Sequence, residues 1–445
     1  MRRLPADPMD VMEQVLKLSR ADETEAVVYA RAGGLTRFAS SVIHQNVYEE
    51  DAVLLLRVAV GNRIAGVRTN RLSRDGLQDA VDRALAIARL TPPDPAFPGL
   101  ADPKPVPSDG RYVPATAEAS PEDRASRVRT FVEMCGDVQA SGALETEAAR
   151  VAIGNSRGVR AEASQTQASF VSVVDGGDAT GFVEAADADL RKLSVESLAH
   201  RAMSKVMMGR RPRDIPAGRY TVILEPPAVG LMMNYLGFVV FNGKAIQEGR
   251  SYLVGRLGQR IVDERISLWD DATDPRTIGL PFDLEGVPKR KVMLIEQGIA
   301  RSGVYDLRTA KLAGTESTGH ALPQPNAFGP IPMNLFLSTG EKTLDALIQS
   351  TDRGLLITRF HYVRVVDPLQ TVITGMTRDG TFLIEGGQIA GGVKNLRFNQ
   401  SMIETLANME AIGAEAALSG EDFFGKAFAP PLKVRDFNFT GTTTF

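Results

Sequence analysis

The sequence predicts an α+β protein in two parts: an N-terminal domain of an antiparallel sheet with helices, and a C-terminal domain that is mostly antiparallel β, a sandwich or a pseudo-barrel. Residues 24–68 and 145–186 alternate apolar and polar side chains as strands do, and helical patterns precede and follow each run. From residue 219 onward, short strand-like segments rich in glycine and proline replace this order. We therefore expect domains at residues 1–215 and 216–445.

Length and composition are those of a folded globular protein. At 445 residues the chain is too long for one ordinary hydrophobic core, and its 43% hydrophobic and 24% charged residues exclude general disorder. The net charge of −3 gives no electrostatic reason to expect nucleic acid. The one dense basic run, GRRPRD at 209–214, is typical of a solvated loop, and a phosphate-binding patch is the alternative.

The environment expected for the chain is the reducing cytoplasm. The single cysteine, Cys135, cannot form an intrachain disulfide and lies in a helical pattern as a small core residue. The first residues, MRRLPADPMDVMEQ, lack the apolar segment of a signal peptide, and no apolar run approaches the roughly 18 residues of a membrane span. We therefore expect a cytoplasmic protein that binds neither a membrane nor a nucleic acid.

The N-terminal domain is expected to begin with a helix over residues 9–19 and a strand meander. The residues placed where turns are needed are Gly33, Gly34, Gly61 and Asn62. Apolar residues at helical spacing over 73–90 predict a helix that packs on the sheet. The Pro-rich, aperiodic segment 91–121 is expected to be a linker or a strap over the surface. Further helices are expected at 121–140 and 194–209.

The C-terminal domain is expected to contain three helices among many strands, near 226–237, 341–349 and 401–409. The pairs Asp379-Gly380 and Gly386-Gly387 have the residue types of hairpin turns. GNSRG at 154–158 matches the G-x-S-x-G elbow of hydrolases. A strand-like segment follows it where the elbow needs a helix, so a hairpin turn is expected.

Residues 268–288 hold five carboxylates, which raises the possibility of a site for a hard metal ion: Asp270, Asp271, Asp274, Asp283 and Glu285. The spacing lacks the alternating D-x-D-x-D-G pattern of a calcium loop, so we expect a solvated loop.

Histidine is scarce. His44, His200, His320 and His361 have no spacing suited to a shared metal. The first two are expected to be structural. His320 and His361, with Tyr362, are the candidates for lining a pocket in the C-terminal half.

Several stretches resemble the TldD/PmbA family. The most specific is GLPFDLEGVPKRKVMLIEQGIARSGVYDLRTAKLAGTESTGHAL at 279–322, which is similar to the family's Phe-Asp-x-Glu-Gly-Val-Pro block and Ser-Thr-Gly segment. GTFLIEGGQI at 380–389 resembles the family's IENG hairpin, and LTRFASSVIHQN at 35–46 resembles part of its first domain. The resemblance covers nearly the whole chain.

The resemblance implies a two-subunit peptidase. The TldD-type subunit carries His-Glu-x-x-x-His on a helix, and a later cysteine completes a zinc site. Imidazole and thiolate ligands hold the metal, and the Glu takes a proton from the metal-bound water. Here the lead-in PPAVGLMM is followed by Asn234 and Tyr235 in place of His and Glu, and by Val239 in place of the second His. The chain thus resembles the metal-free TldE-type (PmbA) subunit, with no catalytic or metal-binding residues and no cofactor of its own.

Three functions follow as hypotheses. The first is a non-catalytic subunit that pairs with a TldD-like His-Glu-x-x-x-His subunit, in which alone zinc is expected, and that helps to hold unfolded or short peptides as extended strands. The second is a stand-alone homodimeric protein for peptide binding or assembly, without hydrolytic activity. The third is an enzyme with a different site near His320 and His361.

Overall fold

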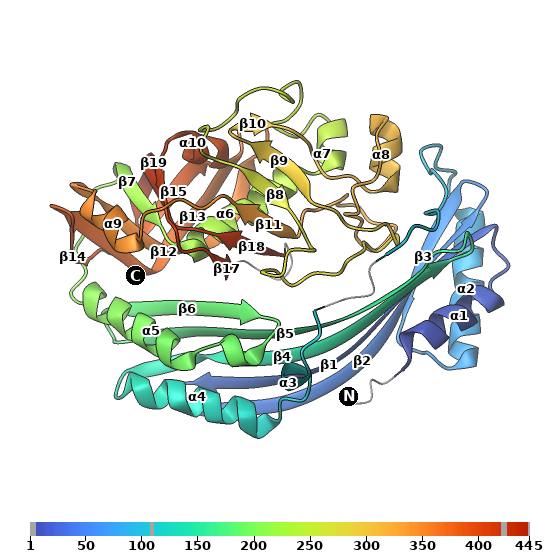
Figure 1. The fold of residues 1–445 in the computed structure, drawn as a ribbon, viewed down its shortest axis with the longest axis horizontal. Helices are drawn as coiled ribbons and strands as arrows, with labels where there is room; N and C mark the ends of the chain where they lie inside the picture. The colour runs from blue at the N-terminus through green and yellow to red at the C-terminus, as the bar shows by residue number, and fades with distance from the viewer. Residues whose placement is uncertain (1–5, 107–110, 420–424, 444–445) are drawn as a thin grey trace.

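The computed structural model describes residues 6–106, 111–419 and 425–443. A long curved sheet forms the N-terminal half, and the C-terminal half lies on one of its faces (Figure 1). The sheet is antiparallel throughout and has the strand order β3-β2-β1-β4-β5-β6. Its strands are β1 (Glu23–Ala39), β2 (Val42–Val60), β3 (Arg63–Thr69), β4 (Gln139–Asn155), β5 (Arg160–Asp175) and β6 (Thr180–Asp187). The predicted α+β class is confirmed.

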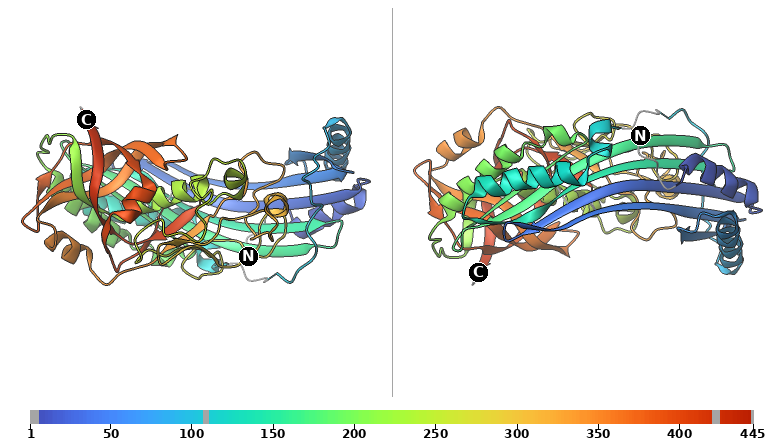
Figure 2. Two further views of the ribbon diagram at one scale, coloured as in Figure 1. Left: turned by 90° about the horizontal axis from the view of Figure 1, so that it is seen from above. Right: turned by 90° about the horizontal axis from the view of Figure 1, so that it is seen from below.

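Helices cover the face of this sheet that the C-terminal half leaves open, as the view from below shows (Figure 2). They are α1 (Pro8–Leu18), α2 (Arg74–Leu90), α3 (Pro114–Ala117), α4 (Pro121–Cys135) and α5 (Val195–Gly209). The core between α4 and the sheet contains aromatic rings, and the ring centroids of Phe131 and Phe170 lie 4.8 Å apart. Cys135 is buried there, as predicted. The α4 helix stops before residue 140 because Gly136 takes φ +58.

The predicted turn at Gly33 and Gly34 is wrong. Both glycines lie inside β1, opposite Glu147 and Thr146 of β4. A Cβ on Gly34 would come within 2.1 Å of the guanidinium carbon of Arg124, a fully buried residue of α4. Glycine is therefore required here for close packing. The β1–β2 turn lies at 40–41 instead, whereas the predicted turn at 61–62 is confirmed.

The Pro-rich segment between α2 and α4 runs over the sheet and contains α3; its residues 107–110 lie outside the described residues. Phe97 and Leu100 are buried against the ends of β2 and β3. Lys311 Nζ, from the C-terminal half, donates to the carbonyl oxygen of Phe97 at 2.9 Å. The segment therefore contacts both halves of the chain.

Two sheets form the C-terminal half. One has the order β10-β9-β8-β11-β18-β17, and the other the order β12-β7-β19-β15-β13-β14. Because β12 also pairs with β13, five strands of the second sheet close into a barrel. The strands are β7 (Gly218–Leu224), β8 (Leu268–Asp270), β9 (Val292–Glu296), β10 (Ile299–Ala300), β11 (Asn334–Leu337), β12 (Arg353–Asp367), β13 (Val372–Glu385), β14 (Gln388–Gly392), β15 (Leu396–Ser401), β16 (Met409–Ile412), β17 (Ala417–Ser419), β18 (Lys426–Ala429) and β19 (Leu432–Thr442).

The expected helices of this half are present, and two more accompany them. They are α6 (Pro226–Val239), α7 (Gly243–Gln247), α8 (Leu307–Ala313), α9 (Leu344–Gln349) and α10 (Met402–Ala407), of which α7 and α8 were not expected. In the described part of the chain, no helix is both long and apolar enough to cross a membrane.

One of the two predicted hairpin turns in this half is wrong. Asp379 and Gly380 lie inside β13 with φ +52 and +131, where the register with β12 shifts. This is a β-bulge, which re-aims side chains within a strand. Gly386 and Gly387 do form the β13–β14 turn.

Candidate functional site

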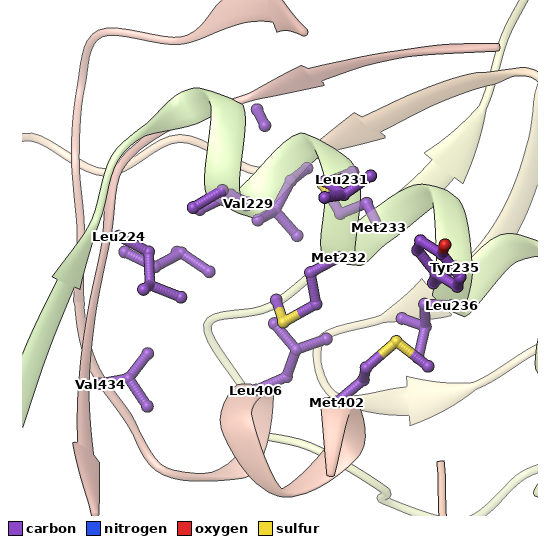
Figure 3. Packing of buried hydrophobic residues seen from close by; sticks show 14 of the residues in the cluster. Leu224, Val229, Leu231, Met232, Met233, Tyr235, Leu236, Met402, Leu406 and Val434 are labelled. Carbon is purple, nitrogen blue, oxygen red and sulfur yellow. The ribbon is translucent and has the colours of Figure 1, made fainter. Parts of the chain in front are cut away.

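Helix α6 carries the positions where the family's zinc motif would stand. It follows β7, begins with Pro226 and Pro227, and is buried on nearly every side, so it is a core helix. Figure 3 shows its side chains among those of neighbouring elements, with Met232 directed toward Leu406 and Leu236 next to Met402 of α10. No side of the helix is exposed to solvent: its residues are buried or partly buried.

The three motif positions are occupied by core side chains. Asn234 is 1% exposed, and its Nδ2 donates to the carbonyl oxygen of Gly425 at 3.1 Å. Its Oδ1 has no hydrogen-bond partner among the described residues. The hydroxyl of Tyr235 donates to the carbonyl oxygen of Val363 at 2.8 Å. Val239 packs in the apolar core. The set offers no imidazole, thiolate or carboxylate, so it does not fit a zinc site of the family's type.

No other metal-binding cluster takes its place in the described part of the chain. Among residues 6–106, 111–419 and 425–443, no three His, Cys, Asp or Glu side chains lie close enough together to hold a metal ion.

His320 is enclosed beside Asp270 of β8. The residue is 2% exposed; its Nε2 lies 2.9 Å from Asp270 Oδ1, and its Nδ1 lies 2.9 Å from the carbonyl oxygen of Thr318. Burial alone would raise the pKa of Asp270, but the His320 ring, Lys289 and the Asn334 N–H outweigh it and hold that pKa below its usual value. His320 thus has no open surface through which to contact a peptide.

His361 and Tyr362 lie apart from His320, on β12 of the barrel. Their rings are 4.2 Å apart, and Tyr362 is 65% exposed with φ +51. Burial and the positive charges of Arg378 and Arg359 lower the pKa of His361. The structure brings these two residues together and leaves His320 in the loop after α8, beside Asp270 of β8. His44 and His200 lie in β2 and α5, a strand and a helix as expected.

The prediction of a solvated acidic loop is wrong for three of its five carboxylates. Asp270, Asp283 and Glu285 are buried. Asp271 and Asp274 do lie in loop and turn structure, where they accept hydrogen bonds from Thr273 and Arg276.

The buried carboxylates of the Phe-Asp-x-Glu-Gly-Val-Pro block join the two halves of the chain. Phe282 inserts among apolar side chains of β1, β4 and β5. Asp283 accepts from the N–H groups of Glu285 and Val287 and thereby holds the turn. Glu285 Oε1 accepts from Arg57 Nη1 at 2.8 Å, and Arg57 Nη2 donates to Glu25 Oε2, also at 2.8 Å. We call Glu25, Arg57 and Glu285 the junction triad.

Carboxylates outnumber cations in and around the junction triad. Burial raises the pKa of Glu25 to about 7, although Arg57 opposes the rise. Burial and Glu285 raise the pKa of Asp283 to about 7 as well. Burial also raises the pKa of Glu285, again against Arg57. One guanidinium thus cannot fully offset the desolvation of these acids.

A second buried contact joins the halves at the start of α6. Lys205 of α5 donates from Nζ to Glu225 Oε2 and, at 3.0 Å, to Thr358 Oγ1. Glu225 is the N-cap residue of α6, but its side chain bonds to no helix N–H. Burial lowers the pKa of Lys205, and Glu225 opposes this. Sequence analysis missed both junction contacts: Arg57 and Glu285 are 228 residues apart, Lys205 and Thr358 are 153 apart, and Lys205 and Glu225, only 20 apart, lie on different elements.

Comparison with known proteins gives the same family over both halves. The family description "PmbA/TldA metallopeptidase C-terminal domain" matches residues 217–441, and "PmbA/TldA metallopeptidase domain 1" matches residues 24–88. The metalloprotease PmbA homolog of Haemophilus influenzae is 25% identical over 88% of this chain and 88% of its own length. A metalloprotease of Methanothermobacter thermautotrophicus is 27% identical over 54% of this chain, and the chain spans about half that relative's length, 52%.

The fold also matches a solved structure. The crystal structure of TldE from Thermococcus kodakarensis superposes with a TM-score of 0.86 at 23% identity, over 97% of this chain and 99% of that one. At this identity the match shows the fold alone. The family description that covers half of the sequence decides the family: the chain belongs to the TldD/PmbA family of metallopeptidase-like proteins.

Proposed function

We propose that this chain is the metal-free, non-catalytic subunit of a cytoplasmic metallopeptidase complex and that it pairs with a TldD-like subunit that holds the zinc. The observation that carries the proposal is α6: Asn234, Tyr235 and Val239 stand where zinc ligands and a catalytic base would be needed, and all three are buried. Neither amide, phenol nor isopropyl group can replace imidazole or the general base in such a site.

The packing of α6 supports this role further. A carboxylate at position 235 would need a buried partner, since an unpaired charge in an apolar core is costly. The hydroxyl of Tyr235 instead satisfies a carbonyl group of β12. In this proposal the helix forms part of the core of the subunit, and the TldD-like partner carries out peptide hydrolysis.

The substrate that we assign to the complex is an unfolded or short peptide, held as an extended strand. Main-chain hydrogen bonds to a strand tolerate many side chains, which suits a peptidase of broad sequence range. In this proposal the chain supplies part of the walls of the peptide-holding chamber.

Co-expression with a TldD-like subunit from the same genome tests the proposal. We expect a stable complex that hydrolyses an unfolded fluorogenic peptide, whereas this chain alone does not. Replacing the motif Glu of the partner with Gln should abolish hydrolysis. The matched change in this chain, Asn234→Ala, should leave the hydrolysis rate of the assembled complex unchanged.

Two results would contradict the proposal. Hydrolysis by this chain alone, lost on His361→Ala, would favour the enzyme with a different site. A stable homodimer that ignores the TldD-like subunit and still binds peptides would favour the stand-alone binding protein.

A further inference from the structure

A cavity lies at the junction of the two halves, away from α6. Its volume is about 420 Å³, and it is lined by the β5–β6 turn, the C-terminal end of α5, the β13 bulge and the segment that joins β14 to β15. These elements meet at the end of the molecule where α5 and β14 lie (Figure 1). Cavities of this size hold small ligands.

The bulge in β13 places one charged side chain, Asp379, in the interior and the adjacent one, Arg378, on the cavity wall. Asp379 is buried, and its carboxylate accepts from Arg359 Nε at 2.8 Å and from Thr180 Oγ1 at 2.8 Å. The neighbouring Arg378 lines the cavity and is 39% exposed. Arg359 pairs closely with Asp379, so Arg378 only shares that carboxylate, at 3.9 Å, and pairs with no other acid among the residues that the structure describes.

The other acid on the cavity wall is also neutralised. Asp178 accepts from Arg210 Nη1 at 3.1 Å and from the backbone N–H of Arg211 at 2.8 Å. Lys394 pairs with Asp214 at 2.8 Å. In contrast, Arg378 Nε lies 3.9 Å from Asp379 Oδ2, the oxygen that already accepts from Arg359. The guanidinium of Arg378 makes no hydrogen bond to any other residue that the structure describes.

The surroundings of Arg378 are positive. Gly209 and Pro212 of the basic run GRRPRD line this cavity, and Arg210, Arg211 and Arg213 are their neighbours along the chain. Arg210 pairs with Asp178, and Arg213 Nη2 donates to the carbonyl oxygen of Ala390. The lowered pKa of His361 agrees with this, since Arg378 and Arg359 add to the effect of burial there. A positive, partly enclosed cavity favours an anion.

We propose that this junction cavity binds an oxyanion, the carboxylate or phosphate group of a small ligand, with Arg378 as its principal donor. A guanidinium presents a planar fork of N–H donors that matches two oxygens of such a group, and Arg378 has these donors available. The proposal does not depend on the pairing with a TldD-like subunit, because the cavity lies within this chain.

Calorimetric titration of the full chain at constant ionic strength tests the proposal. The probes are inorganic phosphate, an N-acetylated dipeptide with a free carboxylate, and the same dipeptide as its C-terminal amide. Saturable binding of phosphate alone would identify a phosphate ligand. Binding of the free dipeptide, but not of its amide, would identify a peptide terminus.

Arg378→Gln should weaken binding about tenfold or more, because a charge-assisted hydrogen bond is lost. Arg378→Lys, which keeps the charge without the fork, should fall between Arg378→Gln and the unmodified chain. The matched control is Arg397→Gln, an exposed arginine on β15 that does not line the cavity. Equal midpoints of thermal unfolding would show that all variants fold.

The proposal is overturned by an absence of saturable binding for all three probes. It is likewise overturned if Arg378→Gln binds as tightly as the unmodified chain, or if Arg397→Gln weakens binding as much as Arg378→Gln.

Discussion

Replacing Arg57 with alanine should destabilise the junction between the two halves of the chain. The guanidinium lies between Glu25 and Glu285, with both N–O distances at 2.8 Å and every side chain of the junction triad no more than 6% exposed. Removing one member of a buried ion pair leaves an uncompensated charge and costs about 3–5 kcal/mol. We expect Arg57→Ala to lower the free energy of unfolding by this amount.

Urea unfolding followed by fluorescence and circular dichroism measures the effect. The one tryptophan, Trp269 on β8, reports on the C-terminal half, and circular dichroism reports on both halves. The control is Arg83→Ala on α2, whose pair with Asp79 is 3.4 Å long and about half exposed, so its loss should cost at most about 1 kcal/mol. If Arg57→Ala costs no more than Arg83→Ala, the junction triad does not hold the halves together and the reasoning fails.

Three further predictions concern the same fold. Glu25 has a pKa of about 7 in the folded chain against its usual 4.5, so between these two pH values the unfolded chain has already lost the proton that the folded chain keeps. The contribution of Glu25 to the free energy of unfolding should therefore fall as the pH rises from about 4.5 to about 7. Urea unfolding of the unmodified chain and of Glu25→Gln, compared across this pH range, should show that fall as a changing difference between their free energies of unfolding. Gly34→Ala should lower the free energy of unfolding by about 1–3 kcal/mol, because the added Cβ would lie 2.1 Å from the guanidinium carbon of Arg124. The control Gly33→Ala, whose added Cβ has its nearest neighbour at 3.2 Å, should lower it less. Equal decreases for the two variants would refute this account of Gly34. Phe282→Ala should lower the free energy of unfolding by about 3–5 kcal/mol, because it removes the phenyl ring that packs among apolar side chains of β1 and β4. A decrease below about 1 kcal/mol would show that the Phe-Asp-x-Glu-Gly-Val-Pro block does not hold the two halves of the chain together.

Local patterns could be predicted from the sequence. Alternation gave the long strands of the first sheet, helical spacing gave α2 and α5, and the strand-like residues after GNSRG identified a turn rather than a nucleophile elbow. The absence of the motif residues at Asn234, Tyr235 and Val239 was also readable, because that motif lies within one helix. Such features depend on neighbours a few residues away.

Features that depend on distant partners could not be predicted. Gly34 resembles a turn residue until Arg124 of α4 is placed against it, and Asp379-Gly380 resembles a hairpin turn until β12 is paired with β13. Glu285 resembles a solvated carboxylate because its partner Arg57 stands 228 positions earlier. Only the folded chain shows that these residues are internal.

The metal content of the purified complex tests the central claim most directly. We expect elemental analysis of a co-purified complex with a TldD-like subunit to find one zinc ion per partner subunit and none on this chain when it is purified alone. The account also requires the zinc to disappear when the motif histidines of the partner are replaced by alanine. Stoichiometric zinc on this chain alone, retained after dialysis against a chelator, would contradict it.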